Sequence, residues 1–217
     1  MSRPFTPKKN ETVHATLRCN NKNPLFHLTK NYHDIASWTN SLNCCYNVSV
    51  HHVLFMPNHI HILLTPNENN LGDAMSYFLT NLSKFLNFNN DRINHVFGNR
   101  YRPTRIKDVN HLINVIRYIY QNPVRAQLVK KVEEWPYSSL SFYTGYKNPK
   151  LMLEPDFYTR NLFNSGLDGR EEWIKFISTN LSKLDVQLMK QSLNRSTMKF
   201  TVRQLRDISK AGTSLKL

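Results

Sequence analysis

Two β-rich segments joined by a very short turn place the strongest constraint on how this chain folds. Residues 47–55 and 59–65 are dominated by valine, isoleucine, leucine, phenylalanine and histidine, a composition typical of strands. Met56-Pro57-Asn58 stands between them and favours a turn. Because so few residues separate the two segments, the sequence predicts that they pair as an antiparallel hairpin.

Hydrophobic patterns predict five further elements around this hairpin. In chain order they are a strand over residues 11–18, a helix over 29–42, a helix from about 70 to 88, a strand over 101–109 and a helix over 111–122. Pro103 confines its strand to an edge or an irregularity. Asn110 is the expected cap of the last helix, and Pro123 stops or kinks it. The order β-α-β-β-α-β-α predicts an α+β fold, a ferredoxin-like antiparallel sheet with helices on one face.

The pattern changes after Trp135-Pro136, where short helical segments follow, around residues 154–163, 170–180 and 184–193. We therefore predict one domain over residues 8–148 and a small helical appendage with a basic tail over 149–217. Seven Lys/Arg and one acid between residues 189 and 217 predict that this tail adds affinity for nucleic acid without specificity.

The charge of the chain indicates a polyanionic partner. It carries 29 Lys+Arg against 15 Asp+Glu, a formal net charge of +14, and residues 98–131 hold eight cations and one acid. Such an excess favours nucleic acid first and an anionic membrane surface second.

No apolar run is long enough to span a membrane, the N-terminal residues lack the apolar region of a signal peptide, and three cysteines are too few for a disulfide framework or a zinc knuckle. A cytoplasmic protein is the expectation.

Two histidines in the second strand of the hairpin are candidate metal ligands. His59 and His61 are two residues apart, so they share one face of the strand and can chelate one cation. Imidazole pairs by themselves favour zinc or another transition metal. Because the pattern is so short, it favours by itself the alternative of two polar-face histidines with no ligand role. His51 and His52 point to opposite faces, and we interpret them as polar positions of the strand.

A tyrosine in the last helix is a candidate nucleophile. Tyr118 and Asn122 are four residues apart and share a helix face, whereas Tyr120 lies about 200° away around the helix and is predicted to pack in the core. The alternative for either tyrosine is a structural role, as an amphipathic residue at the surface or at the edge of the core. A phenol beside a bound cation suits phosphodiester cleavage, because the cation polarises the phosphate and the covalent intermediate conserves the bond energy for rejoining.

Four motifs resemble those of the REP-associated tyrosine transposases, which belong to the single-tyrosine HUH transposases. They are MPNHIHILL at residues 56–64, HVFGNRYRPTRI at 95–106, RYIYQNPVRAQLV at 117–129 and WPYSSL at 135–140. The opening VHATLRCNNKNPLF is similar to the first strand and loop of that family, so the resemblance covers roughly residues 10–145. Gln127 stands where the family commonly has glycine, and Tyr137 where a second tryptophan is common.

The resemblance implies a metal-dependent single-stranded DNA endonuclease and strand transferase that acts on hairpin-forming repeats. It implies that His59 and His61 bind Mg²⁺ or Mn²⁺, that Asn122 is a third ligand, and that Tyr118 forms a 5′-phosphotyrosine and leaves a free 3′-OH. Candidate phosphate contacts are Arg18, Arg100, Arg102 and Arg105. The expected partner is single-stranded or hairpin DNA, and no interaction with a membrane is expected. The protein is expected to be cytoplasmic and associated with the nucleoid, as a monomer or a homodimer.

Two other interpretations stay open. A catalytically silent binder of structured DNA or RNA on the same scaffold fits the same charge pattern, and a metal-dependent cleavage assay separates it from an enzyme. A relaxase or replication initiator uses the same chemistry but usually has a larger chain.

Overall fold

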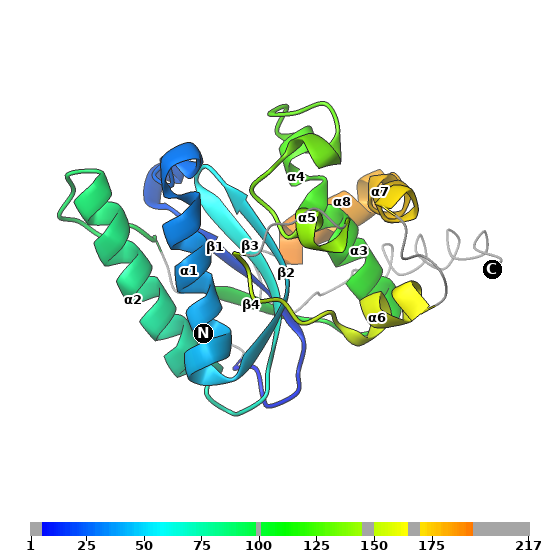
Figure 1. Ribbon diagram of the computed structural model, residues 1–217, viewed down its shortest axis with the longest axis horizontal. Coiled ribbons are helices and arrows are strands. Elements are labelled where there is room, and N and C mark those ends of the chain that lie inside the picture. The colour runs from blue at the N-terminus through cyan, green and yellow to red at the C-terminus, as the bar shows by residue number, and fades with distance from the viewer. Residues whose placement is uncertain (1–5, 99–100, 145–149, 165–169, 193–217) are drawn as a thin grey trace.

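A four-stranded antiparallel sheet forms the centre of the molecule (Figure 1). The computed structural model describes residues 6–98, 101–144, 150–164 and 170–192. The strands are β1 (Val13–Arg18), β2 (Val48–Met56), β3 (His59–Pro66) and β4 (Arg102–Arg105), in the order β2-β3-β1-β4. Strand order and element order together give the predicted ferredoxin-like α+β fold.

The predicted hairpin is confirmed, and its register decides which side chains meet at one end of the sheet. Met56 of β2 pairs with His59 of β3 across the turn. Strand β1 lies on the other side of β3, where Thr16 pairs with His61 and Arg18 with His59. The C-terminal ends of β1 and β2 and the beginning of β3 therefore lie together.

Two long helices cover one face of the sheet. They are α1 (Leu28–Tyr46) and α2 (Leu71–Asn89), whose apolar stripes pack on alternate strand residues such as Ile60, Ile62 and Leu64. These three side chains have no exposed surface. Full burial of one such side chain stabilises the fold by about 1.5–3 kcal/mol. Among the described residues, this layer contains more buried apolar side chains than the layer on the other face and is the larger part of the core.

The other face of the sheet is covered as well, so the expectation of helices on one face is wrong in that detail. Helix α3 (Val109–Tyr120) packs there on Leu54 and Leu63, the strand residues of the opposite parity. Figure 1 shows α1 and α2 on one side of the sheet and α3 with the later helices on the other. Residues of both parities of β2 and β3 are buried, as expected for strands that are covered on two faces.

Short helices after α3 complete this second layer. They are α4 (Asn122–Arg125), α5 (Leu140–Tyr143), α6 (Phe157–Asn164), α7 (Arg170–Ser178) and α8 (Lys183–Ser192), with the 3₁₀ turn η2 (Val132–Glu134) between α4 and α5. Another 3₁₀ turn, η1 (Asn20–Lys22), follows β1. Trp173 of α7 and Met189 of α8 are buried against α3. The segment that we predicted as an appendage thus contributes apolar side chains to the core beside α3.

Two local expectations differ from the structure. The cap of α3 is Asp108, not Asn110: its carboxylate accepts a hydrogen bond of 2.8 Å from the backbone N–H of His111, because a capping oxygen must precede the first turn. Residues 193–217 of the basic tail, on which we expected phosphate contacts, lie outside the described residues. Among the residues that are described, no helix is both long and apolar enough to cross a membrane.

Candidate active site

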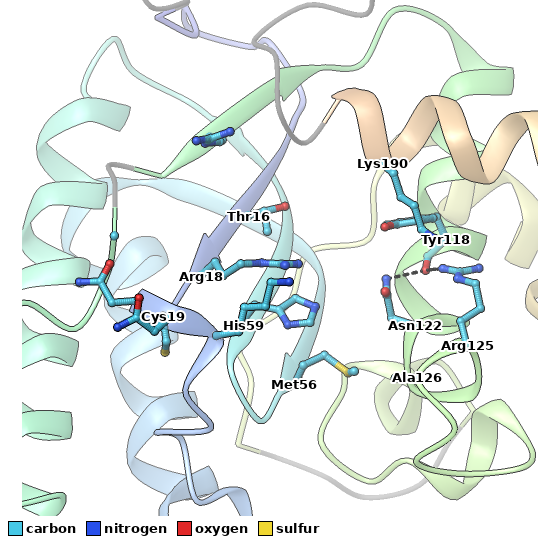
Figure 2. A pocket seen from close by; sticks show the side chains of 15 residues that line it. Thr16, Arg18, Cys19, Met56, His59, Tyr118, Asn122, Arg125, Ala126 and Lys190 are labelled. Carbon is cyan, nitrogen blue, oxygen red and sulfur yellow. Dashed lines mark hydrogen bonds between the residues drawn. The ribbon is translucent and has the colours of Figure 1, made fainter.

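A pocket of about 680 Å³ opens between the end of the sheet and the helices α3 and α4 (Figure 2). Residues from five separate parts of the chain line it, among them Arg18, His59, Arg102, Tyr118, Asn122 and Lys190. Five of the described lining residues are Lys or Arg and none is Asp or Glu. The pocket therefore attracts anions.

The two histidines of β3 lie next to each other, with His59 in the lining of this pocket and His61 buried beside it. Their ring centroids are 4.9 Å apart, as expected for neighbours on one face of a strand. His61 is fully buried; its Nδ1 is 2.9 Å from Nε2 of His14, and its Nε2 has no hydrogen-bond partner among the described residues. His59 Nδ1 lies 2.6 Å from Oδ1 of Asn58 and donates to it, since an amide oxygen only accepts.

Both imidazoles are neutral at physiological pH. Burial, followed by the positive charge of Arg18, lowers the pKa of His59 to about 3. Burial also holds the pKa of His61 well below its ordinary value, and the neighbouring His59 lowers it further. A neutral imidazole keeps a lone pair on one nitrogen, which is the state that binds a metal ion.

The phenol of Tyr118 meets this histidine pair from the opposite side. Its ring is edge-on to His61, with the centroids 5.9 Å apart, and the residue is only 3% exposed. Burial raises the pKa of Tyr118, while the charges of Arg125 and Arg18 lower it. The amide nitrogen of Asn122 donates to the Tyr118 carbonyl at 2.9 Å, which leaves the amide oxygen of Asn122 as an acceptor at the pocket wall.

Tyr120 belongs to a different environment. Its hydroxyl lies 2.8 Å from Nδ1 of His52 and 2.7 Å from Oγ of Ser139, and His52 Nε2 is 3.1 Å from the carboxylate of Asp156. All four residues are buried and none lines the pocket. We interpreted His52 as a polar position of the strand, and the structure adds that it is buried against Asp156, which stands 104 residues further along the chain.

The predicted phosphate-binding arginines separate into three groups. Arg18 and Arg102 line the pocket. Arg105 is exposed and pairs with Glu11 at 3.0 Å, outside the pocket. Arg100 lies outside the described residues.

Three further cations that were not among the predicted site residues line the pocket, namely Lys22, Arg125 and Lys190. Arg125 follows Asn122 by three residues, and its place in the motif RYIYQNPVRAQLV offered a signal. Lys190 comes from α8, and Figure 2 shows it reaching from that helix towards Tyr118. No local pattern connected Lys190 with the motifs of residues 56–140.

The arrangement suits chemistry at a phosphodiester. The phenol of Tyr118, the imidazole of His59 and the amide of Asn122 line one pocket with five cations, and His61 adjoins both His59 and Tyr118. A candidate nucleophile, candidate donor atoms for a metal ion and charges that attract phosphate are therefore neighbours. Among the described residues, no three His, Cys, Asp or Glu side chains gather to hold a metal ion. A cation here would have the two imidazoles and the Asn122 oxygen as its protein ligands.

Comparisons with known proteins agree with this fold and indicate the family. A family model described as transposase IS200-like matches residues 8–122, which include both histidines and Tyr118. A Haemophilus influenzae protein, provisionally named a REP-associated tyrosine transposase, is 30% identical over 129 residues, which are 51% of this chain and 72% of that protein. The solved structure of a REP-associated tyrosine transposase bound to a REP hairpin is similar with a TM-score of 0.54 and 16% identity, over 73% of this chain and 95% of that one.

Proposed function

This chain belongs to the IS200-like transposase family, and on that premise we propose that it cuts and rejoins single-stranded DNA through a covalent bond to Tyr118. The observation that carries the proposal is the contact between Tyr118 of α3 and His61 of β3, inside a pocket with five Lys or Arg side chains. Tyr120, in the same helix, is separated from this pocket by its bonds to His52 and Ser139.

In the proposed reaction, Oη of Tyr118 attacks the phosphorus of a DNA phosphodiester. The Oη–P bond forms and the bond from phosphorus to the 3′ oxygen breaks. The phenolic proton leaves to water, and the 3′ oxygen takes up a proton to become a free 3′-OH. The 5′ phosphate stays on the tyrosine, so a 3′-OH can attack it later and restore a phosphodiester without another energy source.

His59, His61 and Asn122 are the residues that would hold a divalent cation. The buried Nε2 of His61, which lacks a partner among the described residues, and the free nitrogen of neutral His59 fit that role. We propose Mg²⁺ or Mn²⁺, which accept the amide oxygen and leave further positions for water and phosphate oxygens. When bound, the cation polarises the phosphate and offsets its developing charge.

We propose that the substrate is single-stranded DNA beside a hairpin. The related structure named above holds a REP hairpin, and the rim of Arg18, Arg102 and Lys190 supplies charges that attract a phosphate backbone irrespective of its sequence. Tyr118 and the histidine pair come from the same chain, so one protomer would contain a complete site.

A cleavage assay tests this function. Labelled oligonucleotides that span palindromes next to the gene are incubated with the protein and Mg²⁺ or Mn²⁺, and parallel samples contain a chelator. We expect nicking beside the hairpin only with the metal, and a fraction of the label attached to protein. Binding without cleavage under every metal condition would identify a silent DNA-binding protein instead. Cleavage that persists in the chelator would exclude the metal-dependent reaction.

A further inference from the structure

We propose that His14 is a positioning residue that fixes the imidazole of His61 in the tautomer with its proton on Nδ1. In this tautomer the lone pair of His61 lies on Nε2, the ring nitrogen that does not contact His14. Only the consequence for metal binding depends on the proposed function, because the tautomer is a property of the metal-free protein.

The contact is built into the pairing of the two strands. In the register of β1 and β3, Thr16 lies opposite His61, and His14 shares its face of β1 with Thr16. The Nε2 of His14 approaches Nδ1 of His61 to 2.9 Å, and the two rings stack with centroids 5.1 Å apart at an angle of 26°. His14 is 1% exposed and His61 0%, so water does not compete for this contact.

Two arrangements of the proton are possible between two neutral rings. If His61 donates from Nδ1, its Nε2 is an unprotonated acceptor with a free lone pair. If His14 donates instead, the proton of His61 must sit on Nε2, which is buried without a partner among the described residues. An orphaned buried N–H is rarer in proteins than an unused acceptor, and leaving such a donor unpaired costs about 1–3 kcal/mol. The first arrangement is therefore favoured.

That the partner of His61 is an imidazole and not a carboxylate affects the charge of a site proposed to bind DNA. Metal-binding histidines commonly donate their second N–H to a carboxylate, a carbonyl group or water. His14 accepts this proton without bringing a negative charge, so the pocket keeps the excess of positive charge given by its Lys and Arg side chains. A carboxylate at the same place would repel the phosphate that the pocket has to admit.

Thr16 is the competing explanation. Its Oγ1 lies 3.3 Å from the same Nδ1 of His61, a longer contact than the one of His14, and a hydroxyl can rotate to donate or accept. The experiment therefore compares His14→Phe, which removes the acceptor with little change in ring size, His14→Gln, whose amide oxygen can still accept, and Thr16→Val as the matched control on the same strand face.

The test is ¹⁵N NMR of the histidine ring nitrogens in the full-length, metal-free protein at pH 7. We expect His61 to carry its proton on Nδ1 in the wild type, in His14→Gln and in Thr16→Val, and to shift to Nε2–H or a mixture in His14→Phe. A wild-type His61 protonated on Nε2 overturns the proposal by itself, even where a variant fails to fold. So does an unchanged tautomer in a folded His14→Phe.

A second measurement connects the tautomer to metal binding. Electron paramagnetic resonance of free Mn²⁺ gives the dissociation constant of each variant. We expect His14→Phe to weaken Mn²⁺ binding about 10–100-fold, the usual effect of removing such a partner, and His14→Gln to restore most of it. Equal affinity in folded His14→Phe and wild type would contradict the positioning role. Absence of Mn²⁺ binding in the wild type, with the tautomer as expected, would contradict the proposed metal site instead.

Discussion

The guanidinium of Arg125 lies over the ring of Tyr118, 4.4 Å from its centroid, and donates a hydrogen bond to the main-chain carbonyl of the same tyrosine. Arg125 is held in turn by Gln121, whose side-chain oxygen accepts from it at 3.1 Å. One cation is thereby fixed beside the phenol by the turn that joins α3 to α4. Burial of Tyr118 disfavours the phenolate, and this cation opposes that effect.

Replacing Arg125 should make the nucleophile less reactive. In Arg125→Met the pKa of Tyr118 rises further, so a smaller fraction of the phenol is ionised at pH 7. We expect the cleavage rate to fall by roughly 10²-fold, as for the loss of one charge-stabilising group, and the pH–rate profile to move to higher pH. Arg125→Lys should recover part of the rate. The measurement is single-turnover cleavage from pH 6 to 10; an unshifted profile in Arg125→Met would show that the cation does not act on the phenol.

The cations of the pocket should contribute to DNA affinity, and Arg105 should not. Arg18→Gln, Arg102→Gln and Lys190→Met each remove one charge from the pocket rim, so the slope of log K against log salt should become shallower by about 0.7 for a single-stranded ligand. Arg105→Gln and Lys183→Met change the same charge outside the pocket and serve as controls. Fluorescence anisotropy at several salt concentrations gives the slopes. Equal effects in both groups would mean that the DNA does not enter this pocket.

Those elements of the fold and site that depend on local spacing could be predicted from the sequence. The turn at Met56-Pro57-Asn58 specifies the hairpin, and a spacing of two residues in a strand places His59 and His61 side by side. A spacing of four residues in a helix places Asn122 on the face of Tyr118 and not on that of Tyr120. Each of these relationships lies within one strand, one helix or one turn, where the backbone geometry alone determines which side chains are neighbours.

The features that could not be predicted depend on contacts between distant segments. Arg105 meets Glu11, which precedes the neighbouring strand β1. Asp156 contacts His52 from the segment that leads into α6, and Lys190 enters the pocket because α8 packs on α3. No periodicity encodes which surfaces of two elements meet. The same reason explains why the second covered face of the sheet was missed.

The geometry of the turn after α4 explains why glycine is favoured at the position where this chain has Gln127, and it gives a stability prediction. Gln127 has a φ of 58°, and the bonds from Gln127 N to Val124 O and from Leu128 N to Pro123 O, both 3.0 Å, form a helix end that favours glycine. Gln127→Gly should raise the free energy of unfolding by about 1 kcal/mol. Gln127→Ala keeps the Cβ and should give no gain. Urea unfolding measures both, and a Gly variant no more stable than Ala would contradict the account.

Acid should destabilise the metal-free protein through its buried histidines. Burial lowers the pKa of His14 and His59 to about 3 and that of His111 to about 4, whereas the unfolded chain titrates near 6.5. The unfolded state therefore binds more protons below pH 6.5, and stability is lost as the pH falls from 6.5 towards 4, by up to about 1.4 kcal/mol per pH unit for each group.

Thermal unfolding followed by circular dichroism between pH 5 and 7 measures this loss, because carboxylates stay ionised in that range. We expect the melting temperature to fall steadily as the pH decreases. His111→Gln removes one of the three groups and should show a shallower dependence than the wild type. A melting temperature that does not change over this range would mean that these imidazoles are not buried in solution.

The most direct test of the central claim is to identify the tyrosine that becomes attached to DNA. Tyr118→Phe removes one oxygen and should leave folding and hairpin binding intact while abolishing the protein–DNA adduct on a denaturing gel. Tyr120→Phe breaks the bonds to His52 and Ser139, so it should cost about 1–3 kcal/mol of stability and still form the adduct. Mass spectrometry of the digested wild-type adduct should place the nucleotide on Tyr118. A nucleotide on Tyr120, or an adduct that persists in Tyr118→Phe, would contradict the account.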